Sequence, residues 1–307
     1  MTGANNADAN HPQGAQREGL RPPFFLSPRL CLPSAVDRLM WASKSGPAVR
    51  QSREPIFNVP AVVLATLAIF VIVHVTRVYV LSPEADLEFL LLFSFIPARY
   101  DVALLLGGAV PGGFGAQIWT FVTYAFIHAD IAHIGMNAIW FLPFGSAVAR
   151  RFGALRFLAF FAATAACGAA THLAFHTGEM VPVIGASAAV SGMMAASMRF
   201  AFQPGGPLAS WRHRDRDNEA YQIPAAPLRT VLRDRRILAF LIVWFGLNLL
   251  FGLGSLPIIG AGQTVAWEAH MGGFFAGLVL FSAFDSIKKP APLDGGGEEQ
   301  RSPGDNF

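Results

Sequence analysis

Long apolar segments separated by short polar ones repeat along most of the chain. Six such runs lie at about 59–81, 131–149, 154–176, 183–202, 236–253 and 264–284. A helix needs about 20 mostly apolar residues to cross the hydrocarbon core of a bilayer. Each run is therefore predicted to form a transmembrane helix. The fourth and sixth runs are rich in Gly, Ala and Ser, which favours packing against other helices. The expected fold class is all-α, a polytopic membrane bundle of six transmembrane helices.

The connection between the first two runs is long and contains a shorter apolar stretch, Leu87 to Ile96. This stretch is too brief to cross a bilayer. It favours an interfacial or re-entrant element, so the first loop is expected to lie against the membrane.

The two ends of the chain lack this apolar pattern. Residues 1–55 are rich in Pro, Gly, Asn, Ser and Arg and cannot bury enough apolar surface to offset the entropy of ordering. We therefore expect a disordered N-terminal tail at 1–55, a membrane domain at 56–286 and a disordered C-terminal tail at 287–307. Because no basic-then-apolar block with a cleavage site comes early in the chain, the first apolar run is predicted to be a retained span.

Composition and charge agree with a membrane protein. Of the 307 residues, 53% are hydrophobic and 14% are charged, whereas soluble domains carry about 25% charged residues. The basic residues cluster beside apolar runs and form no basic-aromatic face, so no nucleic-acid partner is expected. Arg150, Arg151 and Arg156 come after the second run, Arg199 lies at the end of the fourth run, and Arg212, Arg214 and Arg216 follow it, while 177–182 and 254–263 contain no Lys or Arg. The positive-inside rule therefore predicts that both termini are cytoplasmic. The expected location is the inner (cell) membrane of a bacterium.

The metal-binding residue types do not form a recognisable ligand set in the sequence. Cys31 and Cys167 have neither metal-ligand spacing nor a disulfide framework. His172 and His176 lie one helical turn apart and suggest a metal, but no carboxylate or cysteine completes the set convincingly. The favoured interpretation is an interfacial histidine pair, with no metal and no organic cofactor.

Polar residues inside transmembrane runs are costly and indicate function. In the second run, His133 and Asn137 are four residues apart and share one helical face. The fourth run contains Ser187 among small residues, two positions after Gly185. The sixth run contains His270 on a face made small by the residues Ala269, Gly273 and Gly277.

These positions predict an acyl-transfer site. A serine hydroxyl is a weak nucleophile until a base within hydrogen-bond reach accepts its proton. Small residues allow two helix backbones to approach closely, so the fourth and sixth runs are expected to bring Ser187 to His270. Near a helix N-terminus, Ser187 would also lie where free N–H groups favour an anion. His133 and Asn137 are then placed to donate hydrogen bonds to the developing oxyanion.

This set of residues resembles the rhomboid family of intramembrane serine proteases over roughly residues 57–284. The family pattern is matched in order by the first-loop Trp119, by His133 and Asn137, by Gly185 to Ser187, and by Ala269-His270 with Gly273 and Gly277. The resemblance implies that Ser187 is the nucleophile and His270 the general base and acid. It also implies that His133, Asn137 and the Ser187 backbone N–H are oxyanion donors. His128 is expected to line the water-accessible mouth, with support of the oxyanion site as the less favoured role.

Three positions depart from the family pattern. Ala188 replaces the second glycine of Gly-x-Ser-Gly, and Thr120 replaces the arginine of Trp-Arg. An alanine at 188 is tolerated if the backbone is helical there and strained if φ is positive. Ser191 stands where the family often has an aromatic ring that stacks on the catalytic histidine. Ser191 is also the competing nucleophile, although packing is its favoured role.

The resulting hypothesis is an endopeptidase that cleaves single-span transmembrane proteins within the lipid bilayer through a Ser-His dyad and an acyl-enzyme. An alternative from a different class is a catalytically inactive rhomboid-like protein that binds transmembrane segments. A small transporter is disfavoured, because the span centres lack acidic residues and no repeat of broken helices occurs. Covalent labelling of an activated serine discriminates between the protease and the other two.

Overall fold

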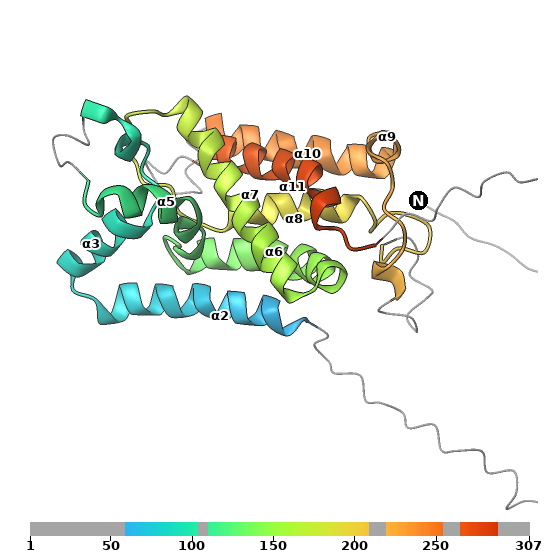
Figure 1. The fold of residues 1–307 in the computed structure, drawn as a ribbon, viewed down its shortest axis with the longest axis horizontal. Helices are drawn as coiled ribbons and strands as arrows, with labels where there is room; N and C mark the ends of the chain where they lie inside the picture. The colour runs from blue at the N-terminus through green and yellow to red at the C-terminus, as the bar shows by residue number, and fades with distance from the viewer. Residues whose placement is uncertain (1–58, 104–109, 209–218, 254–264, 288–307) are drawn as a thin grey trace, which may run out of the picture. The chain divides into compact units, whose positions relative to one another are not determined.

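The computed structural model describes residues 59–103, 110–208, 219–253 and 265–287, and most of these residues are helical (Figure 1). One isolated β-bridge, between Phe95 and Val183, also occurs among them. In chain order the elements are α2 (Ala61–Val75) with the π-helical η1 (Thr76–Val80), α3 (Pro83–Phe93), the 3₁₀ turn η2 (Pro97–Tyr100), α5 (Gly113–Thr123), η3 (Tyr124–Phe126), α6 (Ile131–Phe152), α7 (Ala154–Phe175), α8 (Ser187–Met198), η4 (Glu219–Tyr221), α9 (Leu228–Val231), α10 (Arg235–Leu253) and α11 (Trp267–Phe284).

Three helical segments of the described chain are long and apolar enough to cross a membrane: Ala61–Val80, Ile131–Phe152 and Ala154–Phe175. They correspond to the first three predicted spans. Helices α10 and α11 occupy the fifth and sixth predicted ranges but do not meet the same combined test of length and apolarity. The prediction of six spans is therefore supported in part.

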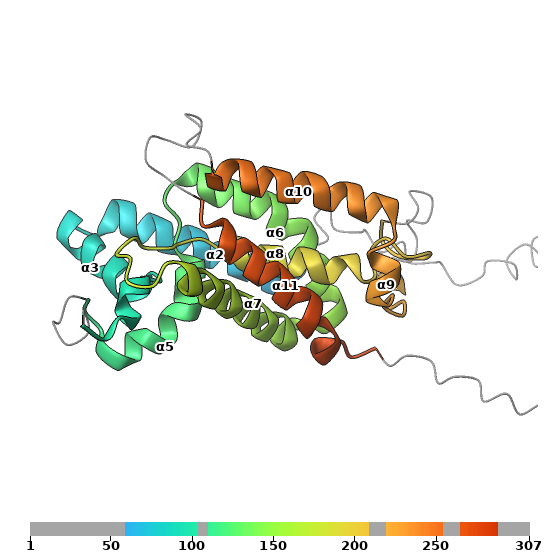
Figure 2. The same cartoon turned by 90° about the horizontal axis from the view of Figure 1, so that it is seen from above.

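The predicted span at 183–202 is wrong in its length. Helix α8 has 12 residues, a rise of about 18 Å against a hydrocarbon core of about 30 Å. It begins late because Gly185, with φ of +113°, has left-handed backbone that a helix cannot contain. From Ala188 to Met198 every residue of α8 is buried, and the helix packs against α6, α7 and α11. In Figure 2, α8 lies between α6 and α11.

Small residues bring α8 and α11 into backbone contact. A Cβ atom added to Gly273 would lie 2.1 Å from the carbonyl oxygen of Ala188, and one added to Gly277 would lie 2.2 Å from that of Gly192. No side chain fits at either glycine without separating the helices. The same face of α8 meets α7, where a Cβ on Gly168 would lie 2.5 Å from the methyl group of Ala188.

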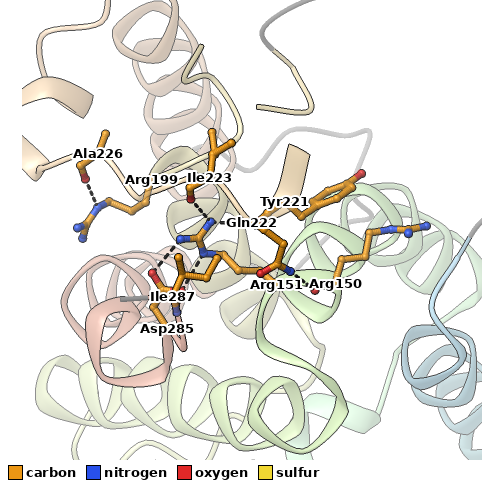
Figure 3. A network of polar contacts seen from close by, with 9 residues as sticks. All are labelled: Arg150, Arg151, Arg199, Tyr221, Gln222, Ile223, Ala226, Asp285 and Ile287. Carbon is orange, nitrogen blue, oxygen red and sulfur yellow. Dashed lines mark hydrogen bonds and ion pairs between the residues drawn. The ribbon is translucent and has the colours of Figure 1, made fainter. Parts of the chain in front are cut away.

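Buried arginines join the helices at one end of the structure (Figure 3). Arg151, near the end of α6, donates to the Asp285 carboxylate at 3.0 and 2.9 Å and to the carbonyls of Tyr221 and Ile223 at 2.9 Å each. Arg199, which follows α8, donates to the carbonyl of Ala226 at 2.7 Å. Two arginines that the sequence pattern assigned to membrane orientation are thus also buried structural groups.

The described part of the first loop is built on α3, η2 and α5. The Leu87 to Ile96 stretch lies largely within α3, and its position relative to the membrane stays a prediction. The buried side chain of Arg99 donates to the carbonyls of Leu91 and Pro111. Tyr100 donates to the carbonyl of Gln117 at 2.8 Å. These bonds join the three short elements, so the loop has the polar interior of a small structured unit.

Candidate active site

Ser187 is the first residue of α8, and the segment before it is bound to the first loop. Val183 exchanges two backbone hydrogen bonds with Phe95, at 2.8 and 3.1 Å, and the N–H of Gly185 donates to the carbonyl of Tyr124 at 3.0 Å. Residue 186 provides no side-chain cap, so N–H groups of the first turn of α8 have no capping side chain. This arrangement is typical of an anion-binding helix N-terminus.

The structure brings Ser187 and His270 together. The Ser187 Oγ lies 2.7 Å from the Nε2 atom of His270, the fourth residue of α11. This is a normal hydrogen-bond distance. Both residues are half-buried. The imidazole is therefore within reach to accept the proton of the hydroxyl.

Asn248 of α10 contacts the other nitrogen of the same imidazole. Its Oδ1 lies 2.5 Å from the Nδ1 of His270, and its Nδ2 donates to the carbonyl of Trp244 at 2.8 Å. The bond to Trp244 directs the amide oxygen toward His270, where it accepts the Nδ1 proton. In the neutral ring, Nε2 is then the unprotonated nitrogen that faces Ser187.

Analysis of the sequence missed Asn248, although it carried a signal. Asn248 is an amide side chain within the otherwise apolar run of α10, and such residues indicate function by default. The family pattern suggested a dyad and no third residue. The position four residues after the serine, where the family often has an aromatic ring, is Ser191. Ser191 donates to the carbonyl of Ser187 at 2.7 Å and is buried, which is the packing arrangement favoured from the sequence.

His133 and Asn137 face the backbone just before Ser187. A Cβ on Gly185 would lie 2.6 Å from the Nε2 of His133 and 3.8 Å from the Nδ2 of Asn137. The N–H of Ala129 donates to the Nδ1 of His133 at 3.4 Å, which leaves the proton of the neutral ring on Nε2. Asn137 donates one amide hydrogen to the carbonyl of His133 at 3.0 Å, and a second remains. Both side chains thus present donors near the start of α8.

His128 does not line an open mouth. Its side chain is fully buried, with its ring centroid 4.9 Å from that of Phe70 and 5.1 Å from that of His133. Burial, together with electrostatic interactions with His133, His74 and Arg77, lowers the pKa of His128 to about 3. The expectation of a water-accessible position is therefore wrong, because the aromatic core around Phe70 covers this ring.

The remaining positions from the family pattern lie in the frame around the site. Trp119 of α5 donates from Nε1 to the carbonyl of Leu92 at 2.9 Å, which joins α5 to α3. Thr120 is buried and donates to its own helix at 2.6 Å. Arg99, from a different part of the loop, binds the loop carbonyls instead. Ala188 lies in the helical first turn of α8, so its methyl group causes no backbone strain.

Comparisons with known proteins agree with these observations. A family model described as "Rhomboid domain" matches residues 115–284 of the 307. The chain is also similar to "RHOMBOID-like protein 7" of Arabidopsis thaliana, with 26% identity over 233 residues, which is 72% of this chain and 64% of the relative. The match thus spans less than two thirds of that relative's length. Because the family match covers more than half of the chain, this integral membrane protein belongs to the rhomboid family, a family of intramembrane serine proteases with some inactive members.

Proposed function

We propose that this protein is an intramembrane serine endopeptidase in which Ser187 is the nucleophile and His270 the general base. The observation that carries the proposal is the 2.7 Å distance between Ser187 Oγ and His270 Nε2, made by two helices in backbone contact. Membership of the rhomboid family supports the same reaction class.

The reaction begins with proton transfer from the Ser187 hydroxyl to His270 Nε2 as Oγ attacks the carbonyl carbon of the scissile peptide. The tetrahedral intermediate collapses when His270 returns the proton to the leaving amine, which departs with the C-terminal product. Water then attacks the acyl-enzyme with His270 again as the base, and the ester bond to Ser187 breaks. Both products are released and the enzyme is regenerated.

Three donors are available for the oxyanion: the backbone N–H of Ser187, His133 Nε2 and Asn137 Nδ2. The proximity of both side chains to Gly185, two residues before Ser187, supports this role. Donors fixed in advance at the position of developing charge stabilise a transition state without reorganisation, and losing one costs about 10²–10³-fold in kcat.

The proposed membrane arrangement is a helical bundle in which α8 is a short, buried helix, with both termini cytoplasmic. The end of the bundle with Arg150, Arg151 and Arg199 then faces the cytoplasm, and Ser187 and His270 lie toward the opposite, outer side. The substrates are single-span transmembrane proteins, as the family resemblance implies. The inactive, segment-binding alternative rested on Ala188, and the helical conformation of that residue weakens it.

Activity-based labelling of the purified full-length protein in detergent tests the proposal. A fluorophosphonate probe is applied to the wild type and to Ser187→Ala, His270→Ala and Ser191→Ala. Ser191→Ala is the matched control, because it removes a hydroxyl one turn away on the same helix. Cleavage of a model single-span substrate is measured in parallel.

We expect the wild type and Ser191→Ala to be labelled and to cleave, and the other two variants to do neither. A folded wild type that is neither labelled nor active would contradict the proposal and favour the segment-binding alternative. Labelling that is lost with Ser191→Ala and kept with Ser187→Ala would show that Ser191 is the nucleophile and would contradict the proposal.

A further inference from the structure

Two histidines and a carboxylate converge where α7 ends and α11 begins. His172 is in the last turn of α7, His176 follows that helix, and Glu268 is the second residue of α11. The Nδ1 of His172 lies 3.7 Å from Glu268 Oε2, and the Nε2 of His176 lies 3.2 Å from Glu268 Oε1. The three ligand atoms are all within 4.8 Å of one another.

These separations fit a small metal ion. In a tetrahedral zinc site with bonds of about 2.0–2.1 Å, neighbouring ligand atoms lie about 3.3–3.4 Å apart. The two observed distances run to different oxygens of the carboxylate, 3.2 Å to Oε1 and 3.7 Å to Oε2, and lie on either side of that value. The i, i+4 spacing of the histidines is also the spacing by which two histidines on one helix face bind zinc in H-E-x-x-H sites.

The state of the nitrogen atoms points to a missing ligand. His172 Nδ1 and His176 Nε2 are buried and lie within ion-pair distance of Glu268, but make no hydrogen bond of acceptable geometry to the described residues. Leaving buried polar atoms without partners costs free energy. The imidazole rings are stacked at 4.2 Å between centroids, and one nitrogen of each lies near the Glu268 carboxylate.

An outer carboxylate completes the pattern. Glu179 Oε1 lies 3.0 Å from the Nδ1 of His176, on the opposite side of the ring from Glu268. Histidines that bind metals commonly donate their other N–H to a carboxylate, which fixes the ring and raises its basicity as a ligand. His176 is thus oriented as such a ligand would be.

We propose that His172, His176 and Glu268 form a binding site for a divalent transition-metal ion. Imidazole nitrogen with carboxylate oxygen favours Zn²⁺, and three protein ligands leave a fourth position for water. The sequence analysis set a metal aside because no carboxylate completed the pair. Folding supplies that carboxylate from α11, and the ion connects α7 to the first turn of the helix that carries His270.

Metal binding to the full-length protein in detergent, with purification tags removed, tests this proposal. The protein is stripped with a chelator, and Zn²⁺ binding is measured by equilibrium dialysis. Co²⁺, a spectroscopic substitute, is titrated in parallel while visible absorption reports a low-symmetry, nitrogen-containing site. Neither readout depends on protease activity. The variants are Glu268→Gln and His176→Asn, with His213→Asn, a histidine outside the described residues, as the matched control.

We expect one Zn²⁺ per wild-type chain and unchanged binding by His213→Asn. A further variant, Glu179→Gln, removes the carboxylate that binds the other nitrogen of His176. Loss of such a partner lowers metal affinity by about 10–100-fold, so the affinity of Glu179→Gln should fall by that factor. The affinity of Glu268→Gln and of His176→Asn should fall by about 100-fold or more. If Glu268→Gln does not purify in folded form, His176→Asn decides. A wild type that binds no Zn²⁺, or ligand variants that bind as tightly as the wild type, would show that the cluster is a metal-free group of ion pairs and overturn the proposal.

Discussion

Asn248 accepts a hydrogen bond from the Nδ1 of His270, at 2.5 Å, across the contact between α10 and α11. With the bond from Ser187 on the other side of the ring, the three side chains form a continuous chain of hydrogen bonds. The base therefore has an orienting partner, although the family pattern suggested a dyad. A base held by a third group is the general form of an activated serine.

Asn248 should matter for the rate of the chemical step and not for substrate binding. Asn248→Leu keeps the side-chain volume but removes the acceptor, so His270 loses its fixed tautomer and orientation. Misplacing a catalytic group by about 1 Å can cost about 100-fold, and we expect kcat to fall by about 10–100-fold while KM changes little. Asn248→Asp restores an acceptor and should retain most of the activity. Steady-state kinetics on a model substrate would make the comparison.

A purely structural role for Asn248 predicts something else. In that case the leucine variant would lose thermal stability together with activity, and Asn248→Asp would not restore the rate. Equal kcat values for the wild type and a folded Asn248→Leu would remove the residue from the mechanism.

Gly185 should be intolerant of any side chain. Its φ of +113° disfavours L-residues, and a Cβ there would lie 2.6 Å from His133 Nε2. Gly185→Ala should therefore displace both the start of α8 and a proposed oxyanion donor, with a loss of about 100-fold or more in kcat. Gly135→Ala is the matched control, because a Cβ on that α6 glycine meets nothing within 4 Å. Cleavage assays on both variants, with thermal unfolding as a folding check, should separate them; similar activities would contradict the argument.

The sequence predicts the features that arise within one helix better than the contacts between residues of different helices. Periodicity and small residues predicted the order of the helices and indicated that Ser187 and His270 belong to one site. Glu268 and His172 are far apart in the chain, and their meeting depends on the rotation of α11 against α7. The contact between Asn248 and His270 depends in the same way on the rotation of α10 against α11. Such contacts depend on how each helix is rotated about its axis, which hydrophobicity alone does not specify.

The hydrophobic pattern also does not specify where each helix begins and ends. Apolar residues continue on both sides of α8, so composition predicted a full-length span where a left-handed glycine begins the helix late. Arg99 illustrates a further limit. Thr120 stands where the family has an arginine beside Trp119, and Arg99, 20 positions before Trp119, binds carbonyls of that loop.

The buried ion pair between Arg151 and Asp285 should be important for stability. Replacing Arg151 by Met removes the guanidinium that binds the carboxylate of Asp285 and two backbone carbonyls. Removing one partner of a buried pair costs about 3–5 kcal/mol, so the midpoint of thermal unfolding in detergent should fall clearly. Arg236→Met is the matched control, since its pair with Asp234 has an arginine side chain that is 58% exposed. Exposed pairs contribute little, and equal shifts in the two variants would count against a structural role for Arg151.

His128 should make the folded protein sensitive to acid. Its pKa is about 3 in the folded state, because of burial and then of the nearby His133, His74 and Arg77, against about 6.5 when unfolded. Above pH 6.5 the residue is neutral in both states and contributes no pH dependence. Between about pH 6.5 and 3 the unfolded chain binds a proton that the folded one excludes, so stability falls as the pH falls, by up to about 1.4 kcal/mol per pH unit.

The variant His128→Phe isolates this contribution, because a phenyl ring suits the aromatic surroundings of Phe70 and cannot titrate. Between pH 7 and pH 5, the wild type should lose about 2 kcal/mol more stability than the variant. Chemical unfolding in detergent at the two pH values gives the difference directly, and groups common to both proteins cancel. Parallel pH profiles would mean that His128 already accepts a proton in the folded state near pH 6, and its position between Phe70 and His133 would then have to open to water.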